Sequence, residues 1–204
     1  MERLRLSDGL LEQVAAYAAE AVSAVSASDL STPTPCAQWD LLSLLLHVHR
    51  SLGFLIASLE HGSRPGPGPV GPARSRQIAG RLDGDAGEVI AAALLHRTER
   101  LVRVHDTIRA GRGPAYVPVG DRLMPRELVA ASGAVEIAVH AWDVATSCGR
   151  VLPIPDAPAT ELLDLSAPLV DAVRRHGLFD PPVPVIANRR PSDRLVALLG
   201  RDPR

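Results

Sequence analysis

Residues 133–143 read GAVEIAVHAWD, a stretch that places an acid and a base four residues apart among apolar side chains. Positions i and i+4 of an α-helix share one face, so Glu136 and His140 project from the same stripe. Apolar neighbours such as Val129 lie on that stripe too, which argues against a purely solvent-facing surface. The stretch predicts a helix over about 125–147, and its spacing leaves two readings open. Either the pair is a solvated contact at the surface, or it points inward and holds a ligand.

The rest of the chain is also dominated by helical patterns. Aromatic residues make up only 3% of the sequence, so Ala, Leu and Val must build the core, which favours helices over a β-sandwich. Ser7 or Asp8 is expected to cap the first helix and Asp40 the second. Besides 125–147, the patterns predict helices over about 9–27, 41–62, 85–110, 158–176 and 191–200.

Four long helices joined by loops predict an all-α fold, an up-down-up-down four-helix bundle. We expect this bundle to span residues 1–150, with a small helical extension over 151–204 packed on it. A short hairpin around Gly120-Asp121 is expected before the helix that starts near 125. The Pro/Gly-rich segment 63–77 is interpreted as a surface loop.

Composition excludes several classes of function. The formal net charge of −1 does not suggest nucleic acid or a membrane surface as a partner. All 22 basic residues are Arg, so lysine Schiff-base chemistry is excluded. The chain has no apolar signal core and no run of 18 apolar residues, and its two cysteines form no CxxC pattern. A cytoplasmic protein is therefore expected; the oligomeric state stays open, with a homodimer as one alternative.

A metal ion would explain an inward-facing acid and imidazole, because it requires an anionic carboxylate and a neutral imidazole. A further ligand is sought in the second helix, at His47 or His49. Residues two apart on a helix point about 200° away from each other, so at most one of these faces the bundle axis. Leucines surround His47, which we therefore choose. His47, Glu136 and His140 would leave an open position on Zn²⁺, with Ni²⁺, Fe²⁺ or Co²⁺ also fitting.

Other reactive side chains are given structural roles. Cys36 should lie about 9 Å or more along the axis from His47, so we interpret it as a packed small residue, and Cys148 likewise. Asp143 is expected to bond an Arg or a backbone group, with support of a metal ligand left open. The tryptophans Trp39 and Trp142 are expected in the core, and the remaining histidines, His61, His96, His105 and His176, at the surface.

Three stretches carry a resemblance to a known family: TPTPCAQWDLLSLLLHV, then EIAVHAWDVATSCGR, then SDRLVALLGRDP. They resemble the actinobacterial branch of the DinB/YfiT-like superfamily, and more narrowly the mycothiol-dependent maleylpyruvate isomerase N-terminal-domain family. The resemblance covers about residues 8–203. It implies a four-helix bundle with a divalent metal, usually zinc, held by a histidine of the second helix and an acid–x3–His pair of the fourth. By motif these are His47, Glu136 and His140.

The resemblance also implies thiol-dependent isomerases and S-transferases, whose metal activates mycothiol, bacillithiol or glutathione. About 55 residues follow the bundle, too few for the C-terminal domain of the isomerase itself, so that activity is not expected. The leading hypothesis is a metal-dependent enzyme that activates a small thiol, mycothiol first, against an electrophilic small molecule. The pocket is expected beside segments 63–77 and 115–124, where Arg74 and Arg76 are candidates for an anionic substrate, though solvated loop charges are the commoner role. Two alternatives remain: a thiol-independent metalloenzyme that uses metal-bound water or Lewis acidity, and a non-catalytic metal-binding stress protein.

Overall fold

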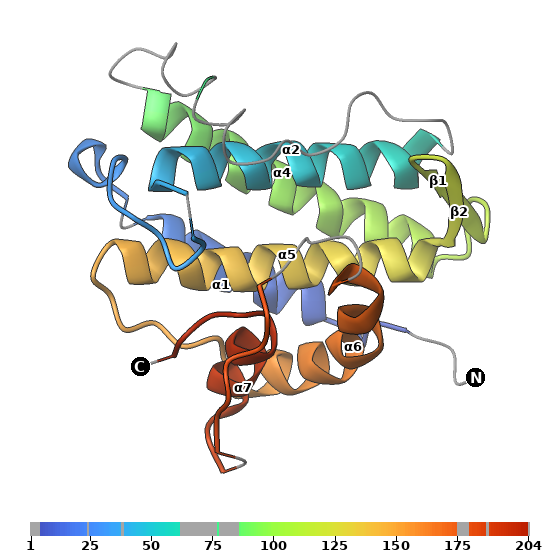
Figure 1. Cartoon of the computed structure of the whole chain (residues 1–204). Coiled ribbons are helices and arrows are strands. Elements are labelled where there is room, and N and C mark those ends of the chain that lie inside the picture. Colours follow the sequence, from blue (N-terminus) through green and yellow to red (C-terminus); the bar gives the residue numbers. More distant parts are fainter. Residues whose placement is uncertain are drawn as a thin grey trace.

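The computed structural model of the chain describes residues 5–23, 25–37, 39–61, 77, 86–174, 180–186 and 188–203. Six α-helices and one small sheet are formed within these residues (Figure 1). The prediction of a mostly helical chain is confirmed. The helices are α1 (Leu10–Val22), α2 (Leu41–His61), α4 (Ala86–Arg109), α5 (Arg126–Ser147), α6 (Asp156–Arg174) and α7 (Pro191–Leu198), with a 3-10 turn at Ala27–Asp29.

The predicted hairpin is present. Strand β1 (Tyr116–Val119) pairs antiparallel with β2 (Arg122–Pro125), and Gly120 takes a φ of 63° in the turn between them. That left-handed backbone conformation costs glycine little and other residues more. The hairpin contacts α2 and α5 and covers one end of the helices (Figure 1).

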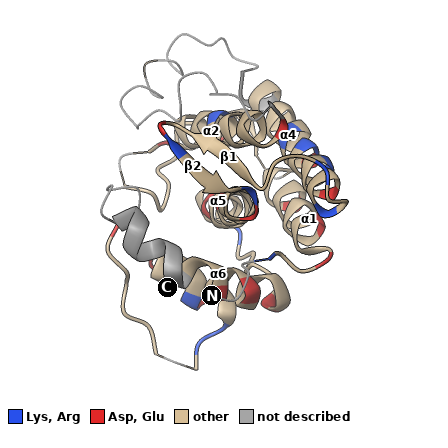
Figure 2. Ribbon diagram, turned by 90° about the vertical axis from the view of Figure 1, so that its right-hand side faces the viewer, with Lys and Arg blue, Asp and Glu red and all other residues tan. Residues whose placement is uncertain are grey.

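Helix α5 lies at the centre of the molecule and contacts α1, α2, α4 and α6. Figure 2 shows α1, α2, α4 and α5 nearly end-on and grouped together, with α6 on the far side of α5. The buried residues of α5 are mostly Ala and Val, small side chains that allow close approach of the neighbouring helices. The division of the chain at residue 150 stays a prediction, although α6 contacts both α1 and α5.

The predicted up-down-up-down order of the helices is wrong. Helices α2 and α4 run in the same direction, because His49 faces Ala93 near their starts and Glu60 pairs with Arg100 near their ends. Helices α1 and α5 run parallel to each other, because Glu20 in the last turn of α1 pairs with Arg150 just beyond the end of α5. Figure 1 shows that these two helices run opposite to α2 and α4.

The length of the connection between α2 and α4 explains this difference. The 21-residue helix α2 is about 31 Å long. The 24 residues between His61 and Ala86 can span up to about 80 Å when extended, enough to return to the start of α2. An antiparallel order follows from short connections, and this connection is long. The segment itself, with Arg74 and Arg76, lies outside the described residues apart from Gln77, as do the side chains of His61 and His176.

The predicted helix starts are half right. Asp40 caps α2, because its Oδ1 accepts a hydrogen bond of 2.8 Å from the backbone N–H of Ser43. Ser7 does not cap α1: its backbone N–H and its hydroxyl both donate to the Glu161 carboxylate of α6. Gly9 precedes α1 instead, and α1 ends at Val22 rather than near residue 27.

The burial of the His and Trp side chains tests the positions predicted for them. His96 is exposed, as predicted, but the side chain of His105 is buried in the core of α4 with only 3% of its surface exposed. The helical period places His105 on the same face as Leu101 and Ile108, both buried. Trp39 and Trp142 are half-buried at the margin of the core rather than inside it.

Two helices are long and apolar enough to cross a membrane by length and composition, α2 and α5. More than half of the apolar window of α2 and more than three quarters of that of α5 are buried inside the fold. Packing in the protein core therefore explains their hydropathy.

Candidate metal centre

Helices α2 and α5 bring together the three residues that the spacing had nominated. His47 Nε2 lies 3.2 Å from Glu136 Oε1, and His140 Nε2 lies 3.8 Å from the same oxygen. The two imidazole rings face each other edge to face, with centroids 5.5 Å apart. One ligand atom from each residue falls within 4.8 Å of the others. That His47, Glu136 and His140 hold a metal stays a prediction.

The choice of His47 over His49 agrees with the direction of these side chains. His47 points from α2 toward α5, whereas His49 points toward α4 and lines a groove with Arg97. Trp39, just before α2, places its ring 4.8 Å from the His47 ring and restricts the orientation of that imidazole. Sequence patterns had placed Trp39 in the core and missed this contact.

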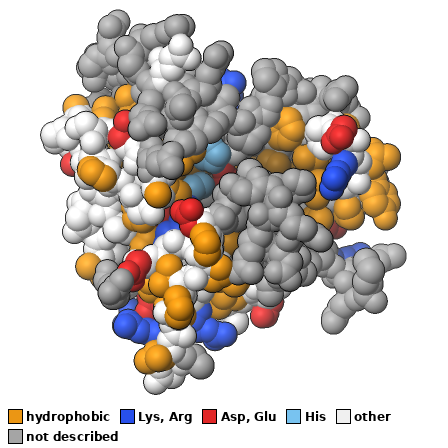
Figure 3. All heavy atoms as spheres, viewed as in Figure 1, with side chains coloured by type: hydrophobic (Ala, Val, Ile, Leu, Met, Phe, Trp, Pro, Cys, Tyr) orange, Lys and Arg blue, Asp and Glu red, His pale blue; other side chains and the backbone are white. Residues whose placement is uncertain are grey.

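The cluster is shielded but not closed. The side chain of His140 is 7% exposed, while Glu136 and His47 are 17% and 20% exposed. On the face shown in Figure 3, histidine side chains reach the surface near the centre of the molecule. The cluster is therefore in partial contact with solvent.

Glu136 is an ionised carboxylate in this environment. Burial by itself raises the pKa of Glu136, but the adjacent imidazoles of His140 and His47, together with the Ser51 hydroxyl, outweigh burial and hold the pKa below its usual value. Its Oε1 atom is nevertheless buried without a well-formed hydrogen bond. A buried acceptor in that condition is costly unless a cation or proton lies next to it.

Asp143, one turn after His140, determines which nitrogen of that histidine carries the proton. The carboxylate is fully buried, and its Oδ2 lies 2.8 Å from His140 Nδ1. Burial raises the pKa of Asp143, but the Arg201 guanidinium and His140 lower it by more than burial raises it. The pKa of Asp143 is therefore below its usual value, and the carboxyl group is ionised. An ionised carboxylate only accepts hydrogen bonds, so Nδ1 donates. In the neutral imidazole, Nε2 then offers a lone pair toward Glu136.

Arg201 holds Asp143 in place from the C-terminal part of the chain. Its Nη2 lies 2.9 Å from Asp143 Oδ2 and its Nε 3.3 Å from Oδ1, while Nη1 donates to the carbonyl oxygen of Leu199 at 2.7 Å. Asp143 had been expected to bond an Arg or a backbone group, and the Arg partner is confirmed. The sequence did not indicate which Arg would be the partner. Residue 201 lies in the SDRLVALLGRDP stretch, but nothing in that stretch predicts a contact with Asp143.

Cys36 is more than the packed small residue that we predicted. Its Sγ lies 3.5 Å from Asp143 Oδ2 and also contacts Nη2 of Arg201. The predicted distance of Cys36 along the helix axis was measured from His47, so it did not reveal these contacts. Cys36 instead approaches His140, on the Nδ1 side of the ring and away from His47. Burial and the Asp143 charge raise the pKa of this thiol, so it is protonated.

Cys36, His140 and Asp143 form a second group within 4.8 Å. A metal there would have to displace the Arg201 guanidinium and deprotonate a thiol whose pKa is raised. Among the described residues, no guanidinium pairs with Nε2 of His140 or with Glu136. The donor set on that side, two imidazole nitrogens and one carboxylate oxygen, fits a divalent metal, with Zn²⁺ favoured among the metals that accept these ligands.

Comparison with known proteins identifies the family of the chain. Two uncharacterised proteins from Mycobacterium tuberculosis, from strains CDC 1551 / Oshkosh and ATCC 25618 / H37Rv, are each 28% identical to the chain over 182 residues, which cover 87% of both sequences. No solved structure matches the chain. The family model described as mycothiol maleylpyruvate isomerase N-terminal domain matches residues 11–145. This range includes α2, α4 and nearly all of α1 and α5, with the three converging side chains. The chain therefore belongs to the mycothiol maleylpyruvate isomerase N-terminal domain family.

Proposed function

We propose that this chain is a metal-dependent enzyme that activates a low-molecular-weight thiol, mycothiol in the first place, for transfer to or isomerisation of an electrophilic small molecule. The observation that carries the proposal is a pair of electron-pair donor atoms, His140 Nε2 and Glu136 Oε1, that face each other between α2 and α5. In the neutral form of His140, which metal binding requires, the Asp143 contact leaves Nε2 with a lone pair, and the carboxylate oxygen Glu136 Oε1 lies 3.8 Å away. A divalent cation coordinated by both atoms and by His47 relieves their repulsion.

The family supports the thiol. The family is described by a mycothiol-dependent isomerase domain, and the match covers the residues of the proposed centre. When bound, a divalent ion with an open position favours the thiolate over the thiol near neutral pH.

The chain does not offer a lysine amine or an activated thiol of its own near the cluster. It contains no Lys, and its two cysteines, Cys36 and Cys148, both have a pKa that burial raises. The thiolate form is the nucleophile, so neither cysteine is activated. In this proposal an external thiol supplies the nucleophile.

Each residue has a distinct task in this proposal. His47, Glu136 and His140 are the metal ligands, in a four-helix bundle made by α1, α2, α4 and α5. Asp143 fixes the tautomer of His140, and Arg201 fixes Asp143. Trp39 holds the His47 ring.

The first experiment measures metal content and thiol binding together. Protein purified without added metal is analysed for metals, stripped with a chelator, and reloaded with Co²⁺. We expect mycothiol to add a sulfur-to-cobalt charge-transfer band, with release of a proton. The His47→Ala protein, prepared in the same way, should give neither signal.

Two outcomes would replace the proposal. A cobalt spectrum that ignores millimolar mycothiol, bacillithiol and glutathione removes the thiol and makes the thiol-independent metalloenzyme the leading reading. A protein that retains no divalent metal at stoichiometric loading removes the metal and with it both enzymatic readings.

A further inference from the structure

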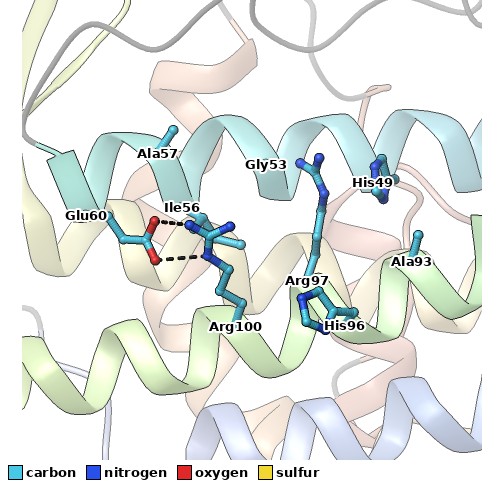
Figure 4. Close-up of a pocket in the computed structure, with 9 residues that line it drawn as sticks. All are labelled: His49, Gly53, Ile56, Ala57, Glu60, Ala93, His96, Arg97 and Arg100. Atoms are coloured by element: carbon cyan, nitrogen blue, oxygen red, sulfur yellow. Dashed lines mark hydrogen bonds and ion pairs between the residues drawn. The ribbon is translucent and has the colours of Figure 1, made fainter.

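A groove of about 400 Å³ runs between α2 and α4, on the face of α2 turned away from His47. Its walls are set by the parallel packing of the two helices. Ile56, Ala57 and Ala93 give it an apolar lining, and Arg97 and Arg100 bring two guanidinium groups to it (Figure 4). A volume of this size lies within the range of small-molecule sites.

Arg97 occupies an unusual position in this groove. Its side chain leaves α4 and reaches α2 at Gly53 (Figure 4). A Cβ atom at residue 53 would lie 1.3 Å from Arg97 Nη1 and 2.5 Å from Cζ. Only a residue without a side chain leaves room for the guanidinium there, so Gly53 creates the position that Arg97 takes.

The described neighbours of Arg97 do not balance its charge. Glu60 forms a two-bond pair with Arg100, through Nε at 2.9 Å and through Nη2. Within the part of the chain that the structure describes, no carboxylate pairs with Arg97. Burial lowers its pKa, and the nearby Arg100 and Arg50 lower it further, which reflects a cluster of positive charge. The guanidinium stays protonated at neutral pH, because its reference pKa is far higher.

His49 lies beside Arg97, and one of its ring nitrogens bonds the backbone of Ala93. His49 lines the groove, and its Nδ1 atom is buried without a hydrogen bond. Burial and the charge of Arg97 lower the pKa of His49, so the imidazole is neutral at physiological pH. The Arg97 cation, without a carboxylate partner among the described residues and at one end of an apolar groove, calls for a ligand with an anionic end.

We propose that this groove binds a small organic carboxylate with a short apolar body. The carboxylate lies against the Arg97 guanidinium, whose planar fork matches two carboxylate oxygens. The apolar body contacts Ile56, Ala57 and Ala93. The groove does not depend on the proposed metal centre, because it opens on the opposite face of α2.

Calorimetric titration with sodium hexanoate, sodium acetate and inorganic phosphate tests the ligand class, at ionic strength matched with sodium chloride. We expect saturable binding of hexanoate, at least about tenfold tighter than acetate, because the longer chain buries more apolar surface. Phosphate binding as tight as hexanoate binding would overturn the assignment to a carboxylate. Absence of saturable hexanoate binding up to about 10 mM, the range of weak sites, would overturn the proposal itself.

Four variants test the location. Arg97→Gln removes the charge, Arg97→Lys keeps the charge without the fork, and Gly53→Ala displaces the guanidinium. Each should weaken hexanoate binding at least tenfold, with Lys intermediate between wild type and Gln. Arg122→Gln, at an exposed position of β2, removes the same charge elsewhere and should change nothing. Circular dichroism establishes that each variant is folded; if Gly53→Ala fails to fold, the two Arg97 variants decide.

Two results would assign the binding elsewhere. An Arg97→Gln protein that binds hexanoate like the wild type excludes the groove. Loss of hexanoate binding after removal of metal by a chelator would place the carboxylate at the metal centre, since the groove should bind equally well with and without metal.

Discussion

His140 receives a different partner on each ring nitrogen, Asp143 on Nδ1 and the His47–Glu136 pair toward Nε2. We therefore expect His47→Ala, Glu136→Ala and His140→Ala each to lower metal affinity well over tenfold, since one of three ligands is lost. His49→Ala is the matched control on the same helix. Elemental analysis and competition with a chromogenic chelator measure the effect. Full occupancy in any of the three variants would remove that residue from the ligand set.

The ion pair between Asp143 and Arg201 predicts a separate effect on stability and on metal affinity. Arg201→Gln leaves the Asp143 charge buried without its main partner, which should cost about 3–5 kcal/mol of unfolding free energy. Asp143→Asn should lower metal affinity about 10–100-fold, because an amide no longer fixes the His140 tautomer as an ionised carboxylate does.

The double variant separates the two roles. Asp143→Asn combined with Arg201→Gln removes both charges, so it should recover part of the stability that Arg201→Gln loses, but not the metal affinity. Urea unfolding of the metal-free proteins and competitive metal titration give the two quantities. If the double variant regains metal affinity as well, Asp143 acts only through the fold.

At the scale of one side chain, the sequence was most informative where helix geometry alone decides. The i,i+4 spacing of Glu136 and His140, and the opposite directions of His47 and His49, follow from 3.6 residues per turn. Trp39, Cys36 and Arg201 were misjudged or missed, because their contacts join segments whose relative placement no local pattern contains. Arg201 meets Asp143 only after α7 has packed against the rest of the fold.

Helices α4 and α5 approach each other closely at Gly133. A Cβ atom at that position would lie 2.6 Å from Cδ2 of Leu101, which is fully buried on α4. Gly133→Val should therefore lower the unfolding free energy by about 1–3 kcal/mol through overpacking, despite the better helix propensity of Val. Ala92→Val, at an exposed position of α4, is the control and should change stability by less than about 0.5 kcal/mol. Chemical unfolding compares the two; equal effects would mean that Leu101 moves aside at little cost.

At the scale of elements, the existence of each helix was predictable and its direction was not. The apolar period gave α2, α4 and α5 to within a residue or two, because burial of one face determines that period. Whether α4 runs with α2 or against it depends on where the chain re-enters the core after residue 61. A long connection permits both, so the period carries no information about it.

The buried His105 makes the stability of the whole molecule depend on pH. Burial lowers its pKa in the folded state, whereas the unfolded chain titrates near the reference value of about 6.5. Below that pH the unfolded state binds a proton more readily, so stability is full above about pH 6.5 and falls as the pH drops below it. We expect His105→Asn to reduce this loss between pH 8 and pH 5.5. Urea unfolding of both proteins at the two pH values measures it, and identical losses would contradict the assignment.

The contact of Arg201 with Asp143 also ties the folding of the middle of the chain to a residue made later. During synthesis, α5 is complete more than fifty residues before the ribosome reaches position 201. If α5 packed fully before then, it would enclose a carboxylate with only a histidine and a thiol beside it, at a cost of several kcal/mol. The nascent chain is more stable with Asp143 still hydrated or protonated. We therefore expect the centre to close only after the emerging chain carries Arg201.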